Sequence, residues 1–206
     1  MNEHPLLMKG PLVRATLEGR KTQTRRPINP QPSDNIENVK YDDVADLWLG
    51  SNKEDNALGY SFSWTARSPL GRSGDRLWVR ETWAQVDKSI APPDMQTGLL
   101  YQASWRYGHC KPSWKPSIHM PRWACRLVLP LVSVRVERVQ DLTEEDARAE
   151  GLRRTENGWT DGTTGYDVTS ARAAFQELWA SIYGQASWDV NPWIWVAEWK
   201  AIEVSK

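Results

Sequence analysis

The 206-residue sequence is poor in the residues that build disulfide scaffolds and metal centres, with 2 Cys and 3 His. So few cysteines exclude a disulfide-rich secreted domain and favour a reducing, cytoplasmic setting. No run of about 18 apolar residues is present, which excludes a membrane-spanning helix. The N-terminal MNEHPLLMKG is too polar for a secretory signal. Lys and Arg number 26, as do Asp and Glu, so no net basic charge indicates a nucleic-acid partner.

Conventional catalytic motifs are also missing. The sequence has no phosphate-binding P-loop, no GxGxxG after a strand, no HExxH and no GxSxG. The candidate metal ligands are His109, Cys110, His119 and Cys125, and their spacing matches no structural zinc pattern. We therefore expect neither a metal ion nor an organic cofactor.

Two features stand out against these absences. Tryptophan is abundant, with 13 Trp beside 2 Phe, and indoles either fill a core or stack on planar ligands such as bases. The charges are also segregated, because the basic stretches 1–28 and 67–138 alternate with the acidic stretches 29–66 and 139–206. Basic stretches that meet in space would form a phosphate-binding patch, and otherwise they are solvated faces.

The residue pattern predicts an α+β fold in a single domain over 1–206. A helix is expected over 4–18, with Pro11 allowing a later start, and strands are expected over 21–27, 74–83 and 126–138. A short helix follows the N-cap Thr143, a longer helix covers 170–183, and a last strand starts at Asn191. Such an order predicts a small sheet closed into a barrel. Segments 28–72, 84–115 and 152–168 are rich in turn formers and are predicted to be surface insertions.

Five motifs in order carry a family resemblance. They are GRKTQTRR at 19–26, GDRLWVRETW at 74–83, PSIHMPRWA at 116–124, the segment 132–151 with DLTEEDARAEG, and NPWIWVAEW at 191–199. Together they resemble the ASCH family, and most of all its longer, tryptophan-rich, prophage-type members. The resemblance implies a small PUA-like β-barrel with helices around it and the three insertions outside the shared core.

The resemblance also implies a cleft for a modified nucleoside, RNA or DNA. Compact members of the family look like amidohydrolases that remove the acetyl group from N4-acetylcytidine with a lysine, a threonine and a glutamate. By motif, these residues correspond to Lys21, Thr24 and Glu150. This chain is much longer than those members, so its insertions could extend or block the pocket.

The three residue types suit amide hydrolysis. A threonine hydroxyl beside a desolvated lysine can act as nucleophile and base, as in Ser–Lys enzymes. A strand would place Lys21 and Thr24 on opposite faces, so a bulge or turn at 22–23 is required. Glu150 is expected at the end of a short helix, where the dipole disfavours a carboxylate and suits it to protonate the leaving amine. Its alternative role is that of a solvated residue before a Gly cap.

Further residues of these motifs are candidates for binding a base or phosphate. Glu81 is in phase with Leu77 and Val79, so we expect an inward carboxylate paired with Lys21, Arg25 or Arg26. Tryptophans of the insertions (Trp48, Trp64, Trp105, Trp114 and Trp159) are additional stacking candidates. The full set of predicted binding residues is Arg20, Arg25, Arg26, Arg76, Arg80, Glu81, Trp83, His119, Arg122 and Trp123.

Two other functions remain open. The chain could be a non-catalytic module that grips RNA or modified DNA through these cations. It could also be a ribonuclease with His119 as general base, although no second histidine or carboxylate is visibly paired with His119.

Overall fold

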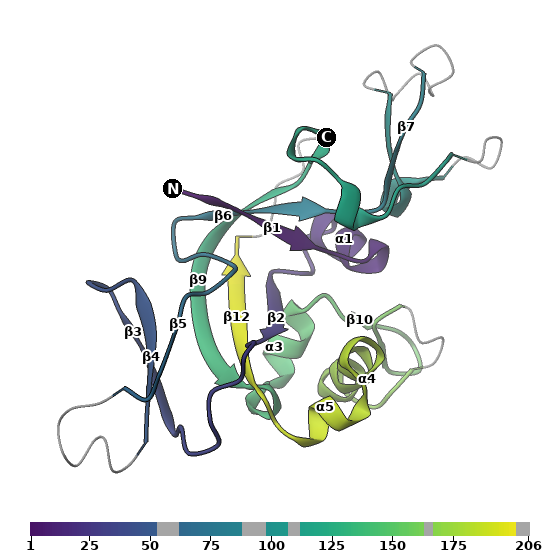
Figure 1. Ribbon diagram of the computed structural model, residues 1–206. Coiled ribbons are helices and arrows are strands. Elements are labelled where there is room, and N and C mark those ends of the chain that lie inside the picture. Colours follow the sequence, from purple (N-terminus) through teal and green to yellow (C-terminus); the bar gives the residue numbers. More distant parts are fainter. Residues whose placement is uncertain (53–61, 88–97, 107–111, 163–166, 201–206) are drawn as a thin grey trace.

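The computed structural model describes residues 1–52, 62–87, 98–106, 112–162 and 167–200 (Figure 1). Its largest sheet has five strands in the order β1-β6-β9-β12-β2. Their bounds are Glu3–Leu7 (β1), Gln23–Pro27 (β2), Arg76–Arg80 (β6), Val128–Arg138 (β9) and Trp193–Trp199 (β12). β1 and β6 are parallel, and the other neighbours in this sheet are antiparallel.

The long strand β9 joins the two halves of this sheet. Its first residues pair with β6, and the stretch from Leu131 to Arg138 pairs with β12 (Figure 1). The edge strands β1 and β2 approach each other through Arg26, whose Nη2 donates to Leu7 O at 3.0 Å. Among the described residues no strand ladder joins these two edges. The fold is therefore mixed α+β, and the closed PUA-like barrel predicted from the sequence is not confirmed.

The described residues form four α-helices beside the sheet. They are α1 (Gly10–Leu17), α3 (Glu144–Ala149), α4 (Ala171–Tyr183) and α5 (Gln185–Asp189). The Ser170 hydroxyl caps α4 by accepting from Ala173 N at 3.1 Å, and Gly184 ends it at a φ of 85°. Glu144 of α3 accepts from the first two backbone N–H groups of α4, at 3.1 Å each, so the two helices are held together. In the described part of the chain, no helix is long and apolar enough to cross a bilayer.

The predicted helix over 4–18 is wrong in its first half. Residues 3–7 form β1, in which Leu6 is buried and its neighbours are more exposed, a period-2 pattern. The helix begins only at Gly10, with Pro11 in its first turn. Proline is tolerated there because its missing N–H has no intrahelical partner in that turn.

The segment 28–72 is not simply an irregular excursion. It contains a three-stranded sheet of β3 (Asn38–Asp42), β4 (Leu47–Ser51) and β5 (Trp64–Ala66). Trp48 and Trp64 of this sheet contact Trp195 of β12, with ring centroids 5.8 and 6.3 Å apart. The segment is thus packed on the main sheet, while its residues 53–61 lie outside the described part.

Short elements complete the other two predicted insertions. One holds the hairpin of β7 (Trp83–Gln85) and β8 (Leu99–Tyr101), and the other holds β10 (Arg153–Arg154) and β11 (Trp159–Thr160). Single 3-10 turns lie at Gln102–Ser104 (η1), Ser117–His119 (η2), Arg122–Ala124 (η3) and Val139–Asp141 (η4).

Most tryptophans pack in the interior. Trp179, Trp195 and Trp199 are each at most 3% exposed and belong to the main core, with Leu77, Leu129 and Ile194. Among the described residues, Trp123 is the one tryptophan with a largely exposed side chain, at 64%. Indoles therefore supply most of the aromatic core of this fold, together with Phe175.

Candidate functional site

Lys21 lies two residues before the edge strand β2 and is held there by contacts to three other elements. Its N–H donates to Ala15 O of α1 at 3.0 Å, and its carbonyl accepts from Trp199 Nε1 at 3.1 Å. The next residue, Thr22, donates to Ala149 O at 2.8 Å, so the chain is joined to the end of α3. These contacts bury Lys21 to 1% exposure and bring it to Glu150.

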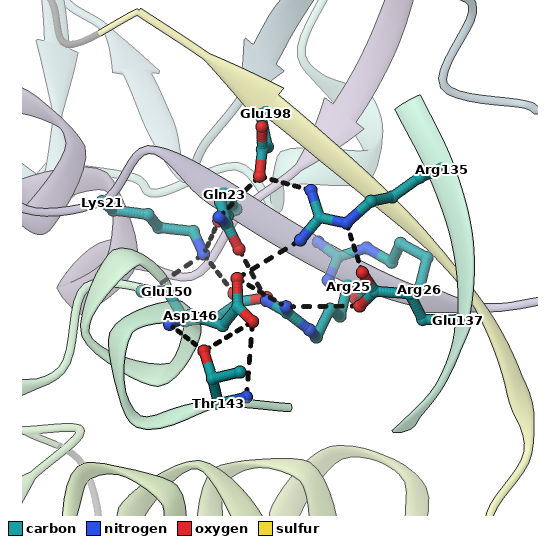
Figure 2. A network of polar contacts seen from close by, with 10 residues as sticks. All are labelled: Lys21, Gln23, Arg25, Arg26, Arg135, Glu137, Thr143, Asp146, Glu150 and Glu198. Atoms are coloured by element: carbon teal, nitrogen blue, oxygen red, sulfur yellow. Dashed lines mark hydrogen bonds and ion pairs between the residues drawn. The ribbon is translucent and has the colours of Figure 1, made fainter. Parts of the chain in front are cut away.

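The Lys21 ammonium has three acceptors, one for each of its protons. Nζ lies 2.6 Å from Glu150 Oε2, 3.0 Å from Glu150 O and 2.6 Å from Gln23 O (Figure 2). Burial lowers the pKa of Lys21, and the Glu150 carboxylate opposes that shift. The structure thus forms a buried Lys–Glu ion pair from two residues 129 positions apart.

Glu150 is the C-cap residue of α3 and lies between two cations. Its second oxygen, Oε1, is 3.2 Å from Arg25 Nη1. The Arg25 side chain is fully buried, and its Nη2 lies 3.2 Å from Asp146 Oδ1 and 3.7 Å from Glu137 Oε2. Nε and Nη2 of Arg25 make no hydrogen bond among the described residues, so these last two contacts are purely ionic. The two cations oppose the unfavourable helix dipole at Glu150.

The ion pair belongs to a larger polar network on one face of the sheet (Figure 2). Arg135 contacts Glu137, Glu198 and Asp146, and Gln23 Nε2 donates to Glu198 Oε1 at 2.7 Å. Arg135 lies on β9 and Glu198 on the neighbouring strand β12, so the network includes residues of two interior strands of the sheet.

Asp146 is fixed in the network by the N-terminal cap of α3. Thr143 and Asp146 form a reciprocal capping box, with Asp146 N donating to Thr143 Oγ1 at 3.1 Å. Burial acts to raise the pKa of Asp146, but the Thr143 hydrogen bond and the Arg25 charge outweigh it and lower the pKa to about 2. The helix cap and the buried charges are therefore one structural unit.

Thr24 is buried beside this network but on the other side of its strand. In the β2–β12 register Thr24 pairs with Ala197, whereas Gln23 pairs with Glu198 and Arg25 with Val196. Alternation along a strand places Thr24 on the opposite face from Gln23 and Arg25. Lys21 Nζ bonds the carbonyl of the peptide that joins Gln23 to Thr24. The predicted bulge at 22–23 is replaced by a strand that starts only at Gln23, with the Lys21 side chain reaching that peptide.

A cavity of about 210 Å³ is lined by sequence neighbours of the ion pair, but not by Lys21 or Glu150 themselves. Its wall includes Arg20 and Gly151, which are the sequence neighbours of Lys21 and Glu150. Other polar side chains in its wall are Arg14, Glu18, Arg153 and Asp161. In the described part of the chain, no three His, Cys, Asp or Glu side chains are grouped as metal ligands would be.

Several of the predicted binding arginines are already paired. Arg20 contacts Glu18 Oε2 and Gly151 O, both at 2.5 Å, and Arg122 contacts Glu3 at 2.7 and 3.0 Å. Arg80 Nη2 donates to Ile118 O, and its guanidinium lies 5.3 Å from the Trp78 ring. Arg26 donates to two backbone carbonyls, and Arg76 is exposed. The basic stretches are thus partly neutralised by acids instead of forming one open patch.

The predicted partner of Glu81 is wrong. Glu81 is buried to 1% exposure, as expected, but its two oxygens accept from Arg126 Nε and Nη2 at 2.8 and 3.0 Å. Lys21 and Arg25 are instead held by the acids of α3. Sequence reasoning misses Arg126 because nothing in the sequence shows that the residues before β9 pass beside the end of β6.

The PSIHMPRWA segment contributes one exposed imidazole and one exposed indole. His119 ends the turn η2 and is exposed, and Trp123 stands edge-on to buried Trp83 at 5.7 Å. The Trp83 ring, which is 3% exposed, is covered by Trp123 and by Lys115 at 4.9 Å. Trp105 and Trp114 contact each other at 6.0 Å, and Trp159 lies below Arg148. His109 and Cys110 lie outside the described residues.

Other members of the buried network were missed by the sequence reasoning, although faint signals existed. Asp146 is four residues before Glu150 on α3 and hence on the same helix face. Arg135 and Glu137 share one face of β9, and Glu198 is the only charged residue in the apolar strand β12.

Comparisons with known proteins add no relative. No protein-family model, no curated protein and no solved structure matches this chain.

Proposed function

We propose that this chain is an ASCH-type, PUA-like hydrolase that removes the acyl group from N4-acylated cytosine, as a nucleoside or within RNA. The observation that supports it is the buried Lys21–Glu150 ion pair, because the two residues come from separate motifs of the resemblance and meet at 2.6 Å. Thr24 is the third residue of the proposed triad. The cavity of about 210 Å³, whose wall includes Arg20 and Gly151, is the proposed entry for substrate.

The proposed chemistry starts with proton transfer from Lys21 Nζ to Glu150 Oε2, which burial of the ammonium favours. The neutral amine is the proposed base for the Thr24 hydroxyl, whose oxygen attacks the acyl carbonyl. Because the Thr24 side chain lies on the other face of β2, this step requires a movement at the Gln23–Thr24 peptide, whose carbonyl Lys21 Nζ contacts. Glu150 then gives its proton to the departing cytosine N4, and an acyl ester remains on Thr24. Water hydrolyses this ester, giving its proton to Glu150, while Lys21 returns a proton to Thr24.

The test follows cytidine release from N4-acetylcytidine and from an acetylated RNA by chromatography. We expect release by the native chain, its loss in Lys21→Ala and Glu150→Ala, and rescue by Thr24→Ser of the activity that Thr24→Val abolishes. Lys40→Gln is the matched control, because Lys40 is an exposed cation on β3, which belongs to a different sheet. Absence of release on both substrates by folded native protein would refute the hydrolase.

One observation favours a second candidate, a non-catalytic module that binds RNA or modified DNA. All three Lys21 protons and both Glu150 oxygens already have partners, which is the arrangement of a structural ion pair. In that case the native chain releases no cytidine, and it binds oligonucleotides with an affinity that falls steeply with salt. Shortening of the RNA that stops in His119→Ala would instead indicate a ribonuclease.

A further inference from the structure

A second cavity, of about 350 Å³, lies where β1, α1, β2 and the end of α4 meet. It has an apolar part and a polar part. Leu7, Met8, Leu12 and Ile182 form the apolar part, and the polar part is Lys9, Arg26, Thr82, Ser117 and Tyr183. This volume is in the range of small-molecule sites, roughly 300–1,000 Å³.

The polar groups of this cavity are all able to donate hydrogen bonds. Two are cations and three are hydroxyls, and none of the described residues that line the cavity is an Asp or a Glu. Three other cavities, of about 110, 210 and 220 Å³, differ in this respect, because each is lined by at least one Asp or Glu. A cavity lined by cations and hydroxyl donors favours a negatively charged ligand, because such a ligand can accept hydrogen bonds from them without repulsion from a carboxylate.

The two cations of the cavity are not neutralised. In the described part of the chain, neither Lys9 nor Arg26 forms an ion pair. Arg26 is oriented by two backbone carbonyls, Arg25 O and Leu7 O, both at 3.0 Å, so its remaining N–H donors have a fixed direction. Arg20, Arg122 and Arg126, in comparison, are each paired with a carboxylate.

The apolar part of the cavity indicates that the anion carries an organic body. Leu7 and Ile182 are 44% and 38% exposed, which is high for aliphatic side chains. The Tyr183 ring is held by Trp179 at a centroid distance of 4.5 Å and presents a rigid aromatic wall. A flat ring bearing a phosphate fits both halves of the cavity.

We propose that this cavity binds a nucleotide, with its phosphate on Lys9 and Arg26 and its base against Leu7, Ile182 and Tyr183. The site is separate from the Lys21–Glu150 pair, and the proposal does not require the hydrolysis proposed above. Thr82 and Ser117 supply hydroxyl donors for the remaining phosphate oxygens.

The test uses cytidine 5′-monophosphate, which carries no acyl group, so that binding is measured without turnover. Calorimetric titration of the full chain is expected to show binding of this nucleotide at least about tenfold tighter than of cytidine, because a charge-assisted contact is lost without the phosphate. Lys9→Gln and Arg26→Gln should each weaken binding about tenfold. Lys40→Gln should leave it unchanged, because Lys40 is an exposed cation of β3 that does not line this cavity.

Arg26 contacts both edge strands, so Arg26→Gln could destabilise the fold. Lys9 is exposed, and Lys9→Gln therefore tests the proposal in a variant that is expected to fold. Equal binding of cytidine and its monophosphate would overturn the proposal. So would binding of inorganic phosphate as tight as that of the nucleotide, because the apolar part would then contribute nothing. Failure of deacylation with intact nucleotide binding would refute the proposed hydrolase alone.

Discussion

At the scale of single residues, the notable feature is a lysine and an arginine with almost no solvent contact. Lys21 is 1% exposed and Arg25 2% exposed, and Glu150 contacts both. Burying a charge away from water costs roughly several kcal/mol, unless opposite charges and hydrogen bonds replace the lost hydration. Glu150 supplies that replacement for both cations at once. Loss of Glu150 therefore affects two cations, whereas loss of one cation leaves Glu150 with the other as partner.

This asymmetry predicts the order of two destabilising substitutions. Glu150→Gln leaves Lys21 and Arg25 without their shared carboxylate and should lower the free energy of unfolding by about 3 kcal/mol or more. Lys21→Met should cost less, about 1–2 kcal/mol, because Glu150 keeps Arg25 as a partner. Urea unfolding at neutral pH measures both, and an equal or reversed order would contradict the assignment of Glu150 as the shared partner.

At the scale of elements, the turn after α3 determines whether the ion pair can form. Gly151 has a φ of 96°, and a Cβ added there would lie 2.8 Å from the Cβ atoms of Ala15 and Lys21. Only glycine lets the chain leave α3 in this left-handed conformation and pass so close to the end of α1. The glycine thus joins three elements, namely α1, α3 and the residues before β2.

The prediction at this scale compares two glycines with the same kind of φ. Gly162 has a φ of 75°, and no atom of the described residues lies within 4 Å of the position that a Cβ would occupy. Gly162→Ala should therefore lower the free energy of unfolding only through backbone strain, by about 1–2 kcal/mol. Gly151→Ala should lower the free energy of unfolding by about 1–3 kcal/mol more, through overpacking against Lys21. Thermal unfolding of both variants tests this difference, and equal effects would rule out the close approach as the cause.

At the scale of the whole molecule, the segregated charges of the sequence meet inside the fold. Arg25 belongs to the first basic stretch and Arg135 to the second, and both contact Asp146 from the last acidic stretch. Around α3, charges from the basic and the acidic stretches are therefore paired with one another. This pairing accounts for cations that the sequence alone assigned to a phosphate patch.

The network predicts a loss of stability in acid. Asp146 has a pKa lowered from 3.8 to about 2, so the folded state favours its charged form. Asp146 contributes about 2 kcal/mol to the free energy of unfolding above pH 4. This contribution disappears as the pH falls toward about 2, because the carboxylate is then protonated in the folded as well as in the unfolded state.

Urea unfolding from pH 7 to pH 2 tests this contribution. Asp146→Asn should be less stable at pH 7 and should lose less stability in acid than the native chain. Asp34→Asn is the control, since Asp34 is exposed. Parallel pH profiles for the native chain and Asp146→Asn would contradict the prediction.

Local patterns predicted many elements well. The strand at 76–80, the Thr143 cap, the α4 helix with its Gly184 end and the final strand all follow from short-range periodicity and capping chemistry. The same reasoning failed for residues 3–7, because a single buried Leu6 in five residues fits a helix or a strand equally. Only pairing with β6 decides between them.

The candidate site divides in the same way. The sequence by itself determined which residue types are present, the period of each strand, the helix cap and glycine turns, and the three motif residues Lys21, Thr24 and Glu150. The tertiary structure alone decided that Lys21 meets Glu150, that Glu81 pairs with Arg126, and that Lys9 and Arg26 share a cavity without an acid. Ion pairs between residues far apart in the chain depend on which strands become neighbours, and that is set by packing of the whole core and not by local sequence.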